Sequence, residues 1–87
     1  MTREEVILEF KNHLIQYLNL LDTTPEQIHN EEPLFGGDLG LDSIDSVELI
    51  VLLDREYGIK IKNPTEGRQI LVDVNTIVDY IIANRTK

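Results

Sequence analysis

The sequence has no cysteine and no tryptophan, and it holds few basic residues. Without cysteine the protein has no disulfide, no thiolate metal site, no thiol-based redox motif and no cysteine nucleophile. Lys and Arg number 8 against 16 Asp and Glu, so the net charge is −8. Nucleic-acid binding needs a basic surface for the phosphates, so this charge argues strongly against a nucleic-acid-binding protein. Anionic membranes are disfavoured for the same reason, and partners with basic patches are expected.

Long apolar runs are missing as well. The longest is five residues, Leu49 to Leu53, whereas a membrane-spanning helix needs about 20. The N-terminal residues show no signal-peptide pattern, so we expect a soluble cytoplasmic protein with no membrane insertion. No repeat, low-complexity tract or linker divides the 87 residues. The sequence therefore predicts a single domain over residues 1–87.

The two histidines, His13 and His29, do not suggest a catalytic or metal site. They are sixteen positions apart, which is not the spacing of a helical ligand pair. Neither has an identifiable partner in the sequence, so no nucleophile–base pair and no metal site are predicted. We expect His13 at the edge of a helix face and His29 in a loop.

An amphipathic helix is predicted from about residue 3 to about residue 20. Thr2 and Glu5 have the spacing of a capping box, in which each side chain accepts a hydrogen bond from the other residue's amide. Seven apolar side chains follow within about 120° of the helical wheel. They are Val6, Ile7, Phe10, Leu14, Tyr17, Leu18 and Leu21.

The middle of the chain is unusually acidic. Residues 22–56 hold ten acidic residues and one basic residue, Arg55, for a net charge of −9. Residues 22–42 contain prolines and glycines typical of turns, with one helical turn expected at Pro25. A connection of this length in so small a protein is usually functional or disordered.

Three further helices are predicted after this connection. They are a long helix over 43–57 that stops at Gly58, a weak helix over 65–72 and a last helix over 74–84 capped by Asp73. Residues 58–62 alternate like a strand, but a lone strand has no partner, so an extended connection is predicted. The predicted fold is all-α, a small antiparallel four-helix bundle with three long helices and one short helix.

The helix over 43–57 has apolar residues on two sides. Leu49, Ile50, Leu53 and Tyr57 form the stripe expected to face the core. Ile44, Val47 and Val51 lie on the opposite side, together with acidic residues. Single exposed apolar residues are commonplace and need no explanation. Three aligned ones indicate a stripe that contacts a partner.

The start of the same helix carries two serines and three carboxylates, in the run Asp-Leu-Gly-Leu-Asp-Ser-Ile-Asp-Ser from Asp38. Ordinary capping is one explanation, with Asp42 or Ser43 accepting amide hydrogens and Asp45 complementing the helix dipole. A calcium loop is another, but its spacing fails. It needs a glycine where Ser43 stands and a glutamate where Leu49 stands.

Residues 34–49, with the pattern LFxxDLGxDSIDxVEL, resemble the prosthetic-group attachment motif of acyl carrier proteins. The similarity continues in the first amphipathic helix, in Tyr57 and in the last helix. Three features depart from the family pattern. They are Gly36-Gly37 before the motif, Arg55 on the outward face of the second helix, and the poorly matching stretch 62–72.

The resemblance implies that Ser43 receives 4′-phosphopantetheine from coenzyme A through a magnesium-dependent phosphopantetheinyl transferase. The thiol of this arm then carries acyl chains as thioesters, which accounts for the missing cysteine. Asp42 is expected to contact the transferase and its metal. A phosphodiester at a helix start also meets free amides and the positive end of the dipole. Ser46 is the only rival serine, and the helical wheel turns it toward the core.

The resemblance also implies docking of acyl synthases and transferases with basic patches on the start of this helix. The matching positions are Asp38, Ile44, Asp45, Val47, Glu48 and Val51. We expect a monomeric, non-enzymatic acyl carrier of fatty-acid or polyketide-type biosynthesis. A carrier dedicated to an aminoacyl or another acyl group remains an alternative. So does an unmodified acidic interaction module, although the intact Asp42-Ser43-Ile44 argues against it.

Overall fold

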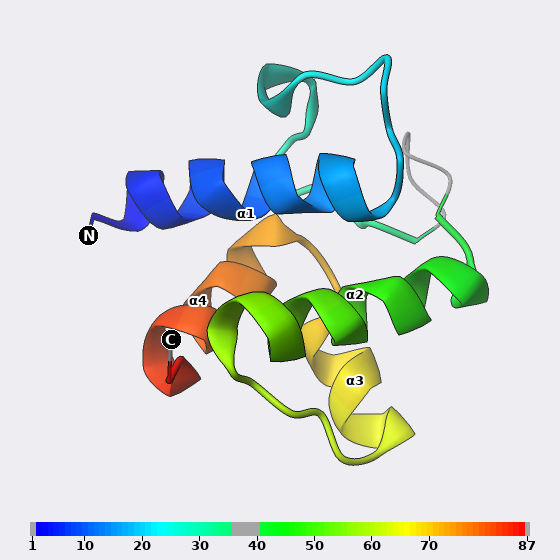
Figure 1. Ribbon diagram of the computed structural model, residues 1–87, viewed down its shortest axis with the longest axis vertical. Coiled ribbons are helices and arrows are strands. Elements are labelled where there is room, and N and C mark those ends of the chain that lie inside the picture. The colour runs from blue at the N-terminus through cyan, green and yellow to red at the C-terminus, as the bar shows by residue number, and fades with distance from the viewer. Residues whose placement is uncertain (1, 36–40, 87) are drawn as a thin grey trace.

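The computed structural model describes residues 2–35 and 41–86, and five helical elements lie within them (Figure 1). They are α1 (Arg3–Tyr17), the 3₁₀ turn η1 (Pro25–Gln27), α2 (Ser43–Tyr57), α3 (Pro64–Ile70) and α4 (Val74–Asn84). In Figure 1, α1 and α2 run in opposite directions, α4 descends below α1 at the left of the view, and the short α3 lies below α2. The described part has no strand beyond one isolated bridge. The prediction of a small bundle of three long helices and one short helix is confirmed.

Local sequence signals set most helix boundaries. Thr2 and Glu5 form the expected capping box at the start of α1. Gly58 ends α2 in the left-handed conformation with φ 68°, which a residue without Cβ adopts readily. Asp73 caps α4 by accepting a hydrogen bond from the Thr76 amide at 2.8 Å.

The predicted end of α1 is wrong. The helix stops at Tyr17 because Asn19 adopts a left-handed φ of 57°. The Leu20 amide then donates to the Ile15 carbonyl at 2.9 Å, which is a Schellman closure with asparagine in the place of glycine. Leu21 leaves the helix face as a result, and it is 81% exposed instead of buried.

One apolar cluster joins the helices. Its helical members are Val6, Phe10 and Leu14 from α1, Leu49, Leu52, Leu53 and Tyr57 from α2, and Val74, Ile77, Val78 and Ile81 from α4. The connections add Ile28, Leu34, Leu41, Ile59, Ile70 and Leu71. Each long helix thus buries one stripe, which leaves the opposite side of α2 facing outward. None of the described helices is long and apolar enough to cross a membrane.

Candidate functional site

The N-terminus of α2 is closed by two carboxylates. Oδ1 of Asp42 accepts hydrogen bonds from the amides of Ile44 at 3.0 Å and Asp45 at 3.3 Å. Oδ2 of Asp45 accepts one in return from the amide of Asp42 at 2.9 Å. This reciprocal capping box makes Ser43 the first residue of the helix, between the two capping residues.

The capping arrangement corrects one physical argument made from the sequence. The amides of Ile44 and Asp45 are not free, because Asp42 already accepts from both. The Ser46 amide is also engaged, with the Asp42 carbonyl at 3.3 Å. A phosphate at this end of α2 would therefore be favoured mainly by the helix dipole.

The chain enters α2 from an anchored connection. Leu34 is buried, and its amide donates to the Val72 carbonyl at 2.9 Å, which ties the connection to the turn between α3 and α4. Phe35 and Leu41 then form an isolated bridge, and Leu41 is buried as well. These contacts place Asp42 at the surface beside α3. Asp38, which the sequence assigned to partner docking, lies outside the described residues.

The outward face of α2 carries exposed apolar side chains. Ile44 is 74% exposed and Val47 is 58% exposed, whereas Val51 is half-buried. Among the acidic residues of this segment, Glu48 is exposed and Asp45 is half-buried. The structure thus presents the second apolar side predicted for this helix, strongest in its first turns. Val51, one turn beyond Val47, is the least exposed of these three apolar residues.

The buried face of α2 differs in one respect from the wheel prediction. Leu49, Leu53 and Tyr57 are fully buried as expected, and so is Leu52, which the sequence analysis did not assign. Ile50 lies at the edge of the stripe and is only partly buried. It faces a groove rather than the centre of the core.

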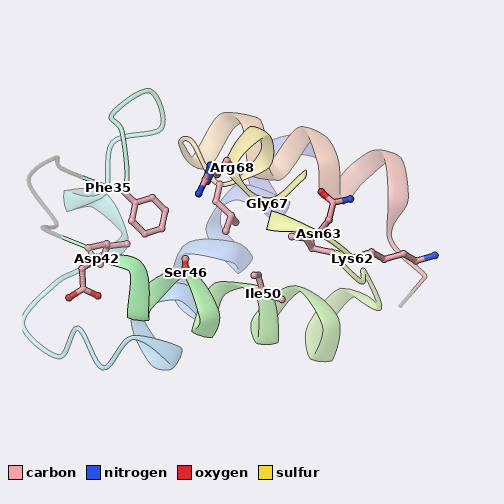
Figure 2. Close-up of a pocket in the computed structure, with 11 residues that line it drawn as sticks. Phe35, Asp42, Ser46, Ile50, Lys62, Asn63, Gly67 and Arg68 are labelled. Carbon is pink, nitrogen blue, oxygen red and sulfur yellow. The ribbon is translucent and has the colours of Figure 1, made fainter. Parts of the chain in front are cut away.

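This groove lies between α2 and α3 and has a volume of about 740 Å³ (Figure 2). Its apolar lining residues are Phe35, Leu41, Ile50, Ile61 and Leu71. Its polar and charged ones are Asp42, Ser46, Lys62, Asn63 and Arg68, and Gly67 completes the wall. Asp42, the neighbour of Ser43, lies at one end of the groove. A space of this volume suits a small organic group.

The wall formed by α3 depends on three residues whose sequence signals were weak. Asn63 caps the helix by accepting from the Glu66 amide at 2.7 Å, and Pro64 occupies the first helical position. Gly67 is buried, and a Cβ at this position would lie 3.6 Å from the Ile61 side chain. The Tyr80 hydroxyl donates to Glu66 at 2.8 Å, which fastens α3 to α4 and raises the pKa of Tyr80. The pair Asn63-Pro64 was the signal available in the sequence.

His13 has a partner that the sequence did not reveal. Its Nε2 lies 3.6 Å from Oε1 of Glu56, and its ring meets the Tyr57 ring edge-on at 5.9 Å. The Tyr17 hydroxyl donates to the same Glu56 carboxylate at 2.8 Å. These contacts fasten α1 to the end of α2, and His29 is exposed in the loop as expected. The groups lie at the Tyr57 end of α2, opposite Ser43.

The geometry suits a covalently attached arm. A group bonded at the first residue of α2 would start beside Asp42 and find an apolar-lined groove next to it. Residues 14–65 match the protein family described as "Phosphopantetheine attachment site". An acyl carrier protein of Wolinella succinogenes is 35% identical over 77 residues, which cover 88% of this chain and 93% of that protein. The chain belongs to the acyl carrier protein family, whose members carry 4′-phosphopantetheine as a covalently attached group.

Proposed function

We propose that Ser43 is the residue that receives 4′-phosphopantetheine. One observation carries this proposal: Ser43 is the first residue of α2, held between the reciprocal caps Asp42 and Asp45, and its neighbour Asp42 lines one end of the groove. The capping box, formed by Asp42 and Asp45, sets the backbone on both sides of the serine. A transferase therefore meets the serine on a preorganised backbone.

The attachment is a phosphoryl transfer to a serine oxygen. The Ser43 hydroxyl oxygen forms a bond to the pantetheine-bearing phosphorus of coenzyme A, and the pyrophosphate bond breaks. 3′,5′-ADP leaves, and the hydroxyl proton passes to a base of the transferase. Asp42 is exposed beside the serine, where its carboxylate is suited to a magnesium ion held by the transferase. When bound, the arm supplies a thiol that forms thioesters with acyl groups, so the protein is a carrier and substrate rather than an enzyme.

Partner enzymes are proposed to dock on the outward face of α2. The exposed Ile44 and Val47 offer apolar contact, and Asp45 and Glu48 offer negative charge beside them. Such a surface fits synthases and transferases that have a basic patch around an apolar depression. Val51 is half-buried and contributes an edge of this face. Asp38 is kept as a proposed contact from the sequence motif alone.

The pathway in which the protein works is proposed only as a class of biosynthesis. We propose that the chain works as a cytoplasmic monomer in fatty-acid or polyketide-type biosynthesis, the role that the motif in residues 34–49 implies by its resemblance to acyl carrier proteins. The similar acyl carrier protein of Wolinella succinogenes supports the carrier role. A carrier dedicated to another acyl or aminoacyl group is the second candidate. The observation that favours it is the pair of cations, Lys62 and Arg68, on the groove wall.

The attachment is tested by intact mass spectrometry after incubation with a broad-specificity phosphopantetheinyl transferase, coenzyme A and magnesium. We expect the wild type to gain one arm and Ser43→Ala to gain none. Ser46→Ala is the matched control, since it removes the other serine of the motif and should gain the arm normally. An arm on Ser43→Ala, or none on a wild type shown by circular dichroism to be folded, contradicts the proposal.

A further inference from the structure

The lining of the groove between α2 and α3 has more basic than acidic residues, whereas the whole chain has more acidic than basic ones. Two of its lining residues, Lys62 and Arg68, are basic and one, Asp42, is acidic. The chain as a whole has 8 basic and 16 acidic residues. The cations also lie beside the strongly acidic segment 22–56, which includes all of α2 except Tyr57. An apolar cargo alone gives no reason for positive charge at this place.

Arg68 is the cation that reaches over the groove. In Figure 2 its side chain extends from α3 so that the guanidinium lies toward Phe35, above Ser46 of α2. Lys62 lies at the other end of the groove, and its amino group points outward. The guanidinium is therefore placed above the path that leads from Asp42 along the apolar floor.

The groove-lining cations take part in none of the ion pairs found within residues 2–35 and 41–86. Those pairs join Arg3 to Asp79, His13 to Glu56 and Arg85 to Glu9. Arg68 is exposed, and it lies next to a floor whose members include Ile50, Ile61 and Leu71. A guanidinium binds a carboxylate through two parallel hydrogen bonds, and a partly enclosed apolar site strengthens that pairing.

We propose that the acyl group carried by this protein bears a carboxylate along or at the end of its chain, and that Arg68 binds this carboxylate while the chain lies on the apolar floor of the groove. The cargo is thus a dicarboxylic acyl group, which corresponds to the second candidate above, a carrier dedicated to one kind of acyl group, rather than to a general carrier of plain alkyl chains. The proposal rests on the proposed function, since it requires the arm on Ser43. Lys62 adds positive potential from the far end without direct contact.

Two other roles for Arg68 give different results in the same experiment. Its methylene stem could simply cover apolar surface, in which case any acyl chain would benefit equally. Its guanidinium could instead bind the phosphodiester of the arm. In that case Arg68→Gln would lower the melting temperature of the form with the unacylated arm as much as that of the acylated forms. The test therefore compares three arms: pantetheine alone, hexanoyl-pantetheine and adipoyl-pantetheine, the last two joined through hydrolysis-resistant amides.

Each arm is loaded onto Ser43 by the transferase, and loading is verified by mass before thermal melting. We expect the adipoyl form to melt about 1–8 °C above the hexanoyl form, the shift that an exposed Arg–carboxylate pair predicts for a domain of this size. Arg68→Gln should abolish this difference while the hexanoyl form keeps its own melting temperature. Lys60→Gln is the matched control, because Lys60 is an exposed cation of the connection between α2 and α3 and does not line the groove.

A second measurement reports on the carboxylate itself. With ¹³C at the terminal carboxyl carbon, its pKa on the wild-type carrier should lie below that of free adipoyl-pantetheine, and Arg68→Gln should restore the free value. Equal melting of the adipoyl and hexanoyl forms with an unshifted carboxyl pKa overturns the cargo proposal. An Arg68 effect already complete on the unacylated arm also overturns it. Failure to load any arm refutes the proposed function instead, so the two failures are distinguishable.

Discussion

Asp42 and Asp45 hold each other at the start of α2, each accepting a hydrogen bond from the backbone amide of the other. The distances are 2.9 Å to the Asp42 amide and 3.3 Å to the Asp45 amide. The residue proposed for modification, Ser43, lies between these two residues in the sequence. The Asp42 carboxylate consequently has two roles. It caps the helix, and it is part of the surface proposed to contact the transferase.

Two substitutions at Asp42 separate the cap from the charge. Asp42→Asn keeps an oxygen that accepts from the helix amides, so the free energy of unfolding should fall by only a few tenths of a kcal/mol. Asp42→Ala removes the cap and should cost about 0.5–2 kcal/mol. Urea unfolding measures both. The rate of arm addition should drop in both variants, because each loses the carboxylate beside Ser43.

Equal modification rates for wild type and Asp42→Asn, with stability preserved, would show that the transferase does not use this charge. Asp54→Asn is a suitable control, since Asp54 is an exposed acid late in α2 and far along the chain from Ser43. It changes the net charge equally and should leave the rate unaltered.

Salt should stabilise this protein. Residues 22–56 carry a net charge of −9, and folding confines these acids more closely than the unfolded chain does. Raising the ionic strength from about 0.01 M to about 0.15 M shortens the Debye length from about 30 Å to about 8 Å and weakens their repulsion. We expect the melting temperature, followed by circular dichroism, to rise with sodium chloride. A melting temperature that stays constant or falls would mean that the acids are already compensated in the folded state.

The two faces of α2 should respond oppositely to substitution. Leu53 is fully buried, so Leu53→Ala should lower the free energy of unfolding by about 2–5 kcal/mol. Val47 is 58% exposed, so Val47→Lys should change it by no more than about 0.5 kcal/mol. Val47→Lys should nevertheless slow arm addition and acyl transfer, because a lysine repels a basic partner and removes an apolar contact.

Leu8→Lys provides the control for this comparison. Leu8 is 50% exposed on α1, away from the proposed docking face, and the substitution changes the net charge by the same amount. Partner rates that fall equally in Leu8→Lys and Val47→Lys would indicate a general charge effect. If Val47→Lys leaves the rates of arm addition and acyl transfer unchanged, partner enzymes do not dock on this side of α2.

Tyr57 should limit stability at high pH. Burial raises the pKa of its hydroxyl well above the ordinary value, and the nearby Glu9 carboxylate adds to the shift. As the pH passes about 10, the unfolded chain loses this proton while the folded one keeps it. Stability is therefore present below that pH and lost above it. Tyr57→Phe should flatten this alkaline loss in urea titrations at increasing pH.

The same variant has a second expected effect at neutral pH. The Tyr57 hydroxyl has no hydrogen-bond partner among the described residues, so its removal should leave stability unchanged or raise it by up to about 1 kcal/mol. Tyr80→Phe is the contrasting control, because it loses the 2.8 Å bond to Glu66 and should cost about 0.5–1.5 kcal/mol. A clear loss of stability in Tyr57→Phe would reveal an acceptor for its hydroxyl.

The sequence predicted the helices well where short-range hydrogen bonds define them. The capping residues Thr2, Asp42 and Asp73 bond to amides two or three positions away, so spacing alone locates the helix starts. Gly58 marks the end of α2 by its own backbone freedom. The end of α1 was missed because asparagine, here Asn19, takes the left-handed conformation less often than glycine, and the local sequence does not decide it.

Periodicity likewise predicted which side of α2 is buried, but the width of the buried stripe depends on the neighbours. Leu52 is covered completely and Ile50 is left at a groove, since the position of α3 decides which edge of the stripe is enclosed. The wheel gives the direction of a side chain from the helix axis. It does not show what lies opposite.

By itself, then, the sequence determined the helical class, the acidic character of the middle segment and the motif around Ser43, because these depend on composition and on neighbours within a few positions. Only the tertiary structure decided that Phe35, Ile50 and Ile61 share one groove, that Arg68 reaches over it, and that His13 meets Glu56. Those residues are far apart along the chain. Their meeting follows from the packing of α3 against α4 and of α1 against α2, which no local pattern specifies.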